Sequence, residues 1–236
     1  MHSYRISMKL NILLRLCILP YSIFAVGCKK DCETSNSTVT DISGNIYNTA
    51  TIGSQIWLKE NLKTTKYNDG TDIPLVIDFR TWRDLKTPGY CWYNNDSASY
   101  KNTYGALYNW YSINTGKLCP LGWHVPSDEE WTTLTDYIGG QDNAGSKLKE
   151  SGTAHWPSPN AYATDEYKFT ALPGGNRSTA GGLFGFVGYR GLWWTSTSFD
   201  VSYAYFRAIY DKENYLDHSP YLFKGTGASI RCLKGE

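Results

Sequence analysis

The stretch Cys119-Pro-Leu-Gly-Trp-His-Val-Pro-Ser-Asp-Glu-Glu-Trp131 carries the clearest local structural signal in this chain. Ser127 stands three residues before Glu130, which is the spacing of a capping box, where each side chain bonds the backbone amide of the other residue. An apolar stripe at helical spacing follows and a glycine pair ends it, in the order Trp131, Leu134, Ile138, Gly139 and Gly140. The stretch therefore predicts a helix that starts after Ser127 and stops before Gly139.

The rest of the chain predicts one further helix, at about residues 104–114, where Leu107, Trp110 and Tyr111 form an apolar stripe, and a short helical turn over 144–149. Residues 63–102 lack sustained periodicity and are expected to form a long ordered loop region. β-branched and aromatic residues between tight turns predict short strands, at 38–58, 89–93, 169–172, 193–197, 203–210 and 227–233. Early helices and late antiparallel strands define a compact α+β domain, and no repeat or second domain boundary is visible.

The N-terminal residues 1–27 have the pattern of a signal peptide. They contain three basic residues and no acidic one, and they end in a twelve-residue apolar stretch that begins after Arg15. A membrane-spanning helix needs about 20 apolar residues. We therefore expect export and cleavage, which would remove three of the 23 basic residues and change the net charge from +1 to −2.

The end of this segment, Ala25-Val-Gly-Cys28, resembles the lipobox of bacterial lipoproteins, with Ala25 in place of the usual Leu. Lipidation of Cys28 would anchor the protein in a membrane by burying acyl chains, and residues 28–37 would form a polar tether. The alternative is an ordinary signal peptide that leaves Cys28 free to pair. We predict an exported, outer-membrane-anchored lipoprotein on the cell surface or on the periplasmic face.

The remaining cysteines are expected to serve structure. Cys32, Cys91, Cys119 and Cys232 show no Cys-x-x-Cys spacing and no nearby His pair, which disfavours zinc and thioredoxin-like chemistry. In an oxidising compartment a disulfide is the default. We expect Cys232 to pair with Cys91 or Cys119, and Cys32 on the tether is the candidate for an unpaired thiol.

Composition narrows the classes of partner. The charge is spread along the chain without a basic block, so a nucleic-acid partner is not expected. Aromatic residues make up 15% of the chain, more than a core of this size needs, and we expect many rings to be half exposed. The preferred exposed rings are Trp156, Tyr189, Trp193 and Tyr203, whereas Trp110, Trp123 and Trp131 are expected in the core.

Nine ordered blocks of sequence resemble the Fibrobacter succinogenes major paralogous domain, a family of exported bacterial proteins, over about residues 38–234. The blocks include Ile56-Trp-Leu-Lys-Glu-Asn-Leu62, Tyr104-Gly-Ala-Leu-Tyr-Asn-Trp-Tyr111, Cys119 to Trp131 and Trp193-Trp-Thr-Ser-Thr197. The resemblance implies a C-type lectin-like domain with two helices, short antiparallel strands and long loops rich in glycine and aromatic residues. It implies export, but the family has no general activity that could be assigned to this chain.

The same fold is used by formylglycine-generating enzymes, whose oxidation chemistry needs a copper-binding pair of nearby cysteines. Here Cys232 has no such neighbour in sequence, and the common hydrolase and phosphate-binding motifs are absent. We therefore predict no enzyme, no catalytic residue and no cofactor, with an oxidase as a remote alternative. His124 is expected to be satisfied by a nearby backbone group or carboxylate.

The leading hypothesis is a binding module for polysaccharide or protein ligands. Flat rings stack on the apolar faces of sugars, and the glycine-rich segments 173–177 and 181–188 let the backbone approach a ligand closely. The candidate ligand-binding residues are Trp156, Arg177, Tyr189, Trp193 and Tyr203, although Arg177 also fits a structural ion pair. Asn94, Asn95 and Asp96 are a weak candidate for a metal site, and a turn explains them better. The competing class is an adhesin-like or assembly subunit that recognises protein.

Overall fold

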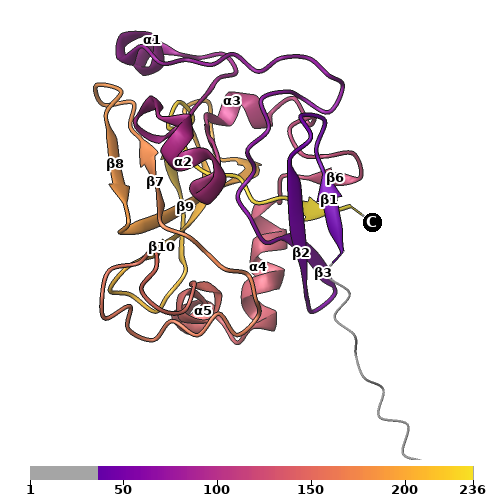
Figure 1. Ribbon diagram of the computed structural model, residues 1–236, viewed down its shortest axis with the longest axis vertical. Coiled ribbons are helices and arrows are strands. Elements are labelled where there is room, and N and C mark those ends of the chain that lie inside the picture. Colours follow the sequence, from indigo (N-terminus) through magenta and orange to yellow (C-terminus); the bar gives the residue numbers. More distant parts are fainter. Residues whose placement is uncertain (1–36, 236) are drawn as a thin grey trace, which may run out of the picture. The chain divides into compact units, whose positions relative to one another are not determined.

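The computed structural model describes residues 37–235, and five of their strands form an antiparallel sheet in the order β1, β2, β3, β12, β6 (Figure 1). The strands are β1 Thr38–Thr40, β2 Ile46–Ile52, β3 Gln55–Leu58, β6 Trp123–His124 and β12 Leu233–Lys234. Strand β12 lies between β3 and β6. The C-terminal end of the described chain therefore pairs in the same sheet as its N-terminal strands.

A second antiparallel sheet contains three strands in the order β11, β10, β9. They are β9 Arg190–Ser198, β10 Tyr203–Tyr210 and β11 Asp217–Phe223. Two further pairs complete the strand set, namely β4 Tyr90–Cys91 with β5 Leu107–Tyr108, and β7 Gly174–Arg177 with β8 Phe184–Val187. Mixed helices and antiparallel sheets confirm the predicted α+β class.

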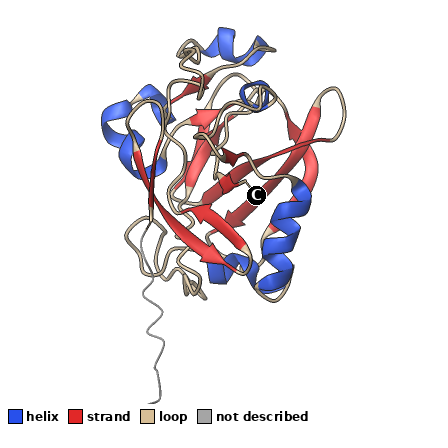
Figure 2. Ribbon diagram, turned by 90° about the vertical axis from the view of Figure 1, so that its right-hand side faces the viewer, coloured by secondary structure: helices blue, strands red, loops and turns tan. Residues whose placement is uncertain are grey.

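The helices within residues 37–235 are short and lie outside the strands (Figure 2). They are α1 Phe79–Asp84, α2 Ser97–Tyr104, α3 Trp110–Ile113, α4 Asp128–Tyr137 and α5 Gln141–Leu148, with a 3-10 turn at Tyr93–Asn95. The capping box predicted for α4 is present, since Glu130 N donates to Ser127 Oγ at 3.1 Å and Ser127 N donates to Glu130 Oε2 at 2.7 Å. The predicted helix and its cap are thus confirmed.

Other predicted elements were wrong in extent or were missed. Residues 104–114 contain β5 and the single turn of α3, because Tyr108 N donates to Ala228 O at 2.9 Å and so pairs as a strand. Asp78 and Asp96 cap α1 and α2 inside the region that was expected to be loop. The predicted strand at 169–172 is reduced to a single bridge, Ala171 with Lys149.

Most of the tryptophans build the interior. They pack in three core clusters, one beneath the β9–β11 sheet, one beneath α4 and a smaller one around Trp82. The fully buried indoles are Trp57, Trp82, Trp131, Trp156, Trp193 and Trp194. Trp57, Trp131 and Phe169 pack with ring centroids 4.7 to 5.8 Å apart. Trp110 and Trp131 are buried as predicted, whereas Trp123 is half-buried. Much of the aromatic surplus therefore serves the core.

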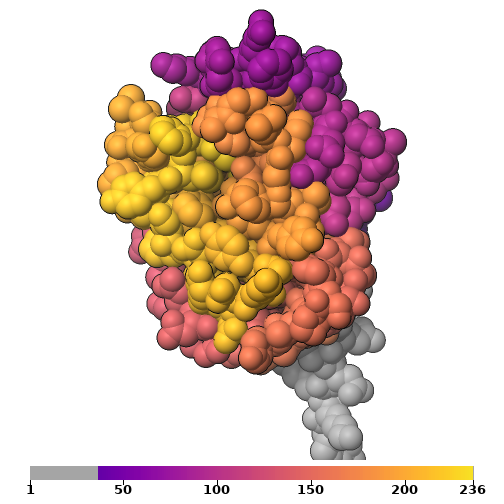
Figure 3. All heavy atoms as spheres, turned by 90° about the vertical axis from the view of Figure 1, so that its left-hand side faces the viewer, coloured from indigo at the N-terminus to yellow at the C-terminus, as the bar shows by residue number. Residues whose placement is uncertain are grey.

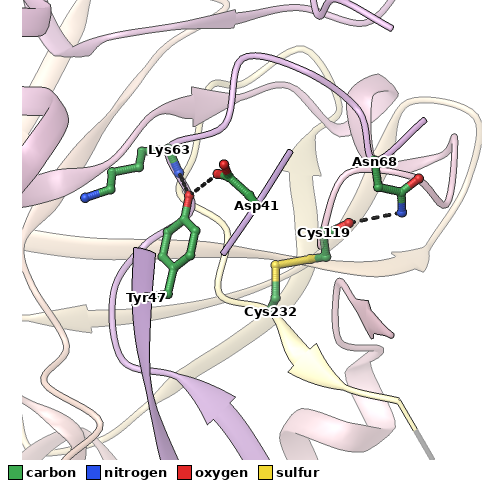
Figure 4. The surroundings of a disulfide bond; sticks show 6 residues. All are labelled: Asp41, Tyr47, Lys63, Asn68, Cys119 and Cys232. Carbon is green, nitrogen blue, oxygen red and sulfur yellow. Dashed lines mark hydrogen bonds between the residues drawn. A yellow bond between two sulfur atoms is a disulfide. The ribbon is translucent and has the colours of Figure 1, made fainter. Parts of the chain in front are cut away.

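A disulfide joins Cys119, before β6, to Cys232, before β12 (Figure 4). The predicted bond to Cys232 is confirmed, and its partner is Cys119 and not Cys91. Cys91 lies buried in β4 and pairs with no cysteine of the described residues. Burial raises the pKa of its thiol to about 12. Near the disulfide, Tyr47 donates to Asp41 Oδ2 at 2.6 Å and accepts from Lys63 N at 3.0 Å.

The signal peptide at 1–27, the lipidated Cys28 and nearly all of the tether at 28–37 lie outside the described residues. Within residues 37–235, no helix is long and apolar enough to cross a bilayer.

Candidate functional site

The two faces of the β9–β11 sheet have different neighbours. Side chains alternate between the faces along β10, and Ala204, Phe206 and Ala208 face the larger core cluster. Ile209 and Arg207 lie on the other face, where Ile209 joins the core under α4 and Arg207 bonds α4 itself. Helix α4 covers only part of this second face, and the residues beyond it are half-buried or exposed.

The uncovered part of this face carries a continuous row of aromatic rings, which we call the aromatic strip and define as Phe199, Tyr203, Tyr205, Tyr221 and Phe223. Successive centroids are 4.4 Å apart for Phe223 and Tyr203, 6.3 Å for Tyr203 and Tyr221, 5.3 Å for Tyr221 and Phe199, and 5.9 Å for Phe199 and Tyr205. Phe199, Tyr221 and Phe223 expose 45%, 66% and 50% of their surface. His218 extends the row, stacked on Tyr205 at 5.8 Å.

Local sequence explains why these rings converge. Tyr203 and Tyr205 are alternate residues of β10, and Phe223 lies directly opposite Tyr203 in β11. Phe199 comes from the turn after β9, where Asp200 Oδ1 accepts hydrogen bonds from Ser202 N and Tyr203 N at 2.7 Å each. The strip is thus held on two paired strands and a tightly bonded turn.

A cavity of about 530 Å³ adjoins the Phe223 end of the strip. Its wall combines the end of α1 and the residues after it with the β9–β10 and post-β11 turns, and its side chains include Arg83, Lys86, Val201, Phe223 and Lys224. In Figure 3 the segment with α1, in purple, lies above a face built from the orange and yellow C-terminal residues. Residues far apart in sequence therefore form one hollow beside the strip.

A smaller cavity of about 120 Å³ lies at the His218 end. Asp128, the first residue of α4, bridges two side chains there, because Arg207 Nη1 is 2.5 Å and His218 Nε2 is 3.1 Å from its carboxylate. Burial lowers the pKa of Arg207, and the contact with Asp128 opposes that shift. Asp128, Arg207 and His218 thus connect α4 to the sheet and place polar side chains at the His218 end of the strip.

The predicted ligand-binding residues fall into two groups. Tyr189 is 56% exposed and Tyr203 belongs to the strip, as expected for surface rings. The expectation that Trp156 and Trp193 are exposed was wrong, because both indoles are buried. Trp156 Nε1 donates to Ala171 O at 3.0 Å, and Trp193 Nε1 donates to Asn61 Oδ1 at 2.8 Å, so each buried N–H has a partner in the core.

Arg177 has the structural role that was weighed against ligand binding, but its partners are carbonyls and not a carboxylate. The fully buried guanidinium donates to Gly182 O, Val76 O and Ile77 O at 2.6 to 3.0 Å and lies 4.6 Å from the Trp82 ring centroid. It thereby holds the glycine-rich turn between β7 and β8 against the chain before α1. Within β7, glycine is required at Gly175, with φ +65°, because a Cβ would lie 2.4 Å from Gly185 O.

The weak candidate for a metal site, Asn94 to Asp96, forms a turn and a helix cap. Asn94 and Asn95 adopt φ values of +52° and +56°, the carboxylate of Asp96 caps α2, and Asn95 Nδ2 donates to Ile77 O at 3.1 Å. Among residues 37–235, no group of three or more His, Cys, Asp or Glu side chains is placed to hold a metal ion. His124 Nε2 lies 2.8 Å from Glu130 Oε1, so the predicted carboxylate partner is present.

Sequence reasoning missed most of the strip. Only Tyr203 was singled out, while Phe199, Tyr205, Tyr221 and Phe223 were not. The alternation of Tyr221 and Phe223 was a usable signal for a strand with one aromatic face. What it could not supply was the pairing of β11 with β10, which brings the two sets of rings together.

Comparison with curated proteins and with solved structures gave no match. A family model, Fibrobacter succinogenes major domain, matches residues 50–234, which include every strand from β3 to β12 and all five helices of the described chain. The matched part contains the aromatic strip, both cavities and the disulfide. The chain thus belongs to the Fibrobacter succinogenes major domain family.

Proposed function

We propose that this protein is a non-catalytic lipoprotein of the bacterial envelope that binds polysaccharide through the aromatic strip, on a domain of C-type lectin-like fold. The observation that carries the proposal is the strip itself, a row of five rings in contact, three of the four contacts edge-on, on a sheet face that α4 leaves uncovered. Exposed rings of this kind offer apolar surface on which the apolar face of a sugar can pack.

The chemistry of the strip favours a sugar ligand. Three of its five rings are tyrosines, whose hydroxyls add hydrogen-bonding groups to a stacking surface. Exposed aliphatic residues are few around it, with Val201 as the main one. A surface of rings and hydroxyls, with a cavity that contains polar side chains at each end, suits a polyhydroxylated chain better than an apolar protein segment.

The competing proposal, an adhesin-like or assembly subunit that recognises protein, has one observation in its favour. Large apolar side chains are exposed around the β7–β8 turn and the chain before α1, namely Leu75, Ile77, Phe79, Leu183 and Phe186. Exposed apolar patches of this kind mark protein contacts. This second surface is distinct from the strip, so variants can separate the two functions.

The non-catalytic part of the proposal is supported by the cysteines. Cys232 is engaged with Cys119, and the buried Cys91 thiol has a raised pKa, which disfavours the reactive thiolate. An oxidase of the formylglycine-generating kind would need a reactive pair. Copper uptake by the purified chain would support the oxidase alternative and contradict this part of the proposal.

The test is binding of the full chain, in mild detergent, to a broad polysaccharide array. We expect retention on at least one polymer and loss of that retention in a Tyr203→Ala/Tyr221→Ala variant. A Leu183→Ser/Phe186→Ser variant serves as the matched control, since it alters the other exposed patch. Binding to no polymer, or binding that survives the strip variant, would contradict the glycan proposal. Loss of a captured protein partner in the control variant alone would favour the assembly subunit.

The envelope location rests on Cys28. A Cys28→Ser variant should lose labelling by a fatty-acid probe and should move from the detergent phase to the aqueous phase. Unchanged partitioning would contradict the lipid anchor, and protease treatment of whole cells would separate the cell surface from the periplasmic face.

A further inference from the structure

The cavity beside Phe223 has an unusual charge balance. Three cationic side chains line it, Arg83, Lys86 and Lys224, against one carboxylate, Asp84. Arg83 and Asp84 satisfy each other, because Nε and Nη2 of Arg83 donate to the two carboxylate oxygens of Asp84 at 2.9 and 2.7 Å. The two lysines therefore remain as the uncompensated charges of this wall.

Lys224 is buried, and it has no carboxylate partner among the described residues. Its Nζ donates to Ser198 Oγ at 2.7 Å and to Asp200 O at 2.6 Å, and it lies 4.3 Å from the Trp110 ring centroid. The carboxylate of Asp200 is directed to the amides of Ser202 and Tyr203 instead. Two neutral acceptors and an aromatic face stabilise the ammonium but leave it without a counter-charge within residues 37–235.

Lys86 is exposed and, within the described chain, has no carboxylate within salt-bridge distance. It lies two residues after α1, and it lines the same cavity as Phe223, which ends the strip. A second lysine on the open side of the cavity adds to the positive potential that a ligand meets on entry.

We propose that this cavity is a subsite for a carboxylate-bearing sugar, so that the polymer on the aromatic strip is a uronate-containing polysaccharide. This inference rests on the proposed function, because the strip supplies the stacking that places the sugar chain next to the cavity. The positive charge of Lys86 and Lys224 is complementary to the carboxylate of the sugar. The rings of the strip contact the rest of the polymer without charge.

The test compares two polymers that differ only at C6, polygalacturonate with a carboxylate and its carboxyl-reduced product with a hydroxymethyl group, by affinity electrophoresis of the full chain in non-ionic detergent. We expect the acidic polymer to bind roughly fivefold more tightly at low ionic strength, the size of effect that one exposed ion pair gives. High salt should remove the difference and leave the stacking contribution.

Variants locate the charge effect. Lys86→Glu should abolish the preference for the acidic polymer and leave binding to the reduced polymer unchanged, while Lys212→Glu, an exposed lysine outside the cavity wall, should change neither. Equal binding of both polymers by the unaltered chain, or an equal effect of the two lysine variants, would overturn the anionic subsite and leave the proposed function standing. Binding of neither polymer, with retention on uncharged polymers of the array, would also overturn the subsite alone. Retention on no polymer at all would overturn both.

Discussion

Tyr203 and Phe223 lie opposite each other in the β10–β11 ladder, and their ring centroids are 4.4 Å apart. The pair joins the row of rings on β10 to the cavity beside Lys224. A cross-strand aromatic pair of this kind contributes about 0.5–1.5 kcal/mol beyond its buried area. It therefore stabilises the sheet and keeps an exposed ring in one orientation for a ligand.

Replacing Tyr203 separates these two contributions. Tyr203→Phe keeps the ring and should bind polysaccharide within about twofold of the unaltered protein, whereas Tyr203→Ala removes the ring contact and should weaken binding by about tenfold, equivalent to about 1.4 kcal/mol. Titration calorimetry measures the affinity, and thermal unfolding controls for the fold. Equal affinities for the Phe and Ala variants would show that the ring takes no part in binding.

The disulfide should be a large single contribution to stability. Cys119 and Cys232 are 113 residues apart in sequence, and cross-links that close loops of about this length stabilise by about 2–5 kcal/mol. A Cys119→Ala/Cys232→Ala variant should lower the free energy of unfolding in urea by that amount, with Cys91→Ala as the matched control. Equal unfolding midpoints with and without the bond would contradict this assignment.

Asn61 is the polar centre of the core between the two sheets. Its Oδ1 accepts from Trp193 Nε1 at 2.8 Å and from Arg231 Nη2 at 3.2 Å, and its Nδ2 donates to Tyr104 O at 2.9 Å. Burial lowers the pKa of Arg231 to about 9, so this guanidinium depends on nearby acceptors. Asn61→Leu should cost about 2–4 kcal/mol, because it leaves buried donors unpaired. A loss below about 0.5 kcal/mol in urea unfolding would refute this role.

The His124 and Glu130 pair should make stability depend on pH. The hydrogen bond to Glu130 raises the pKa of His124, so its contribution is complete below the unfolded value near 6.5 and is lost as pH rises through the higher folded value. Burial opposes ionisation of Glu130, but bonds from His124 and the Ser127 amide outweigh it and lower its pKa, so its contribution is lost in acid, below about pH 4.5.

The pair is therefore worth most between about pH 4.5 and 6.5. In that range His124→Gln should lower the melting temperature by about 1–3 °C, and the difference should disappear at alkaline pH. The exposed His218→Gln variant provides a comparison outside this pair. A difference for His124→Gln that is constant across the range would contradict the coupling.

Local signals in the sequence were sufficient for some elements and insufficient for others. Helix α4 was predictable because Ser127 and Glu130 cap it within one turn. Residues 107–108 looked helical, yet they pair with β4 as a strand, and Tyr108 also bonds Ala228, more than a hundred residues later. Trp193 and Trp194 point to opposite core clusters, since β9 is covered on both faces at that point, and a Trp pair in sequence does not reveal two-sided burial.

The difference between local and tertiary signals also explains why only one residue of the aromatic strip was predicted. Tyr203 was predictable from the alternation in residues 203–210, because that pattern depends only on neighbours in sequence. Phe223 and Tyr221 join it through the register of β10 and β11, and the position of α4 decides which half of the face stays uncovered. Pairing and coverage are tertiary features, so the strip became visible only in the folded chain.

Chemical footprinting of the tyrosines tests the central claim most directly. Nitration of the full chain, with and without a polysaccharide that it retains, should show protection of Tyr203, Tyr205 and Tyr221 by the ligand. Tyr162, which is exposed in a loop outside the strip, should be modified equally in both states. Unchanged nitration of the strip tyrosines in the polysaccharide complex, with protection of Tyr189 instead, would contradict binding through the aromatic strip.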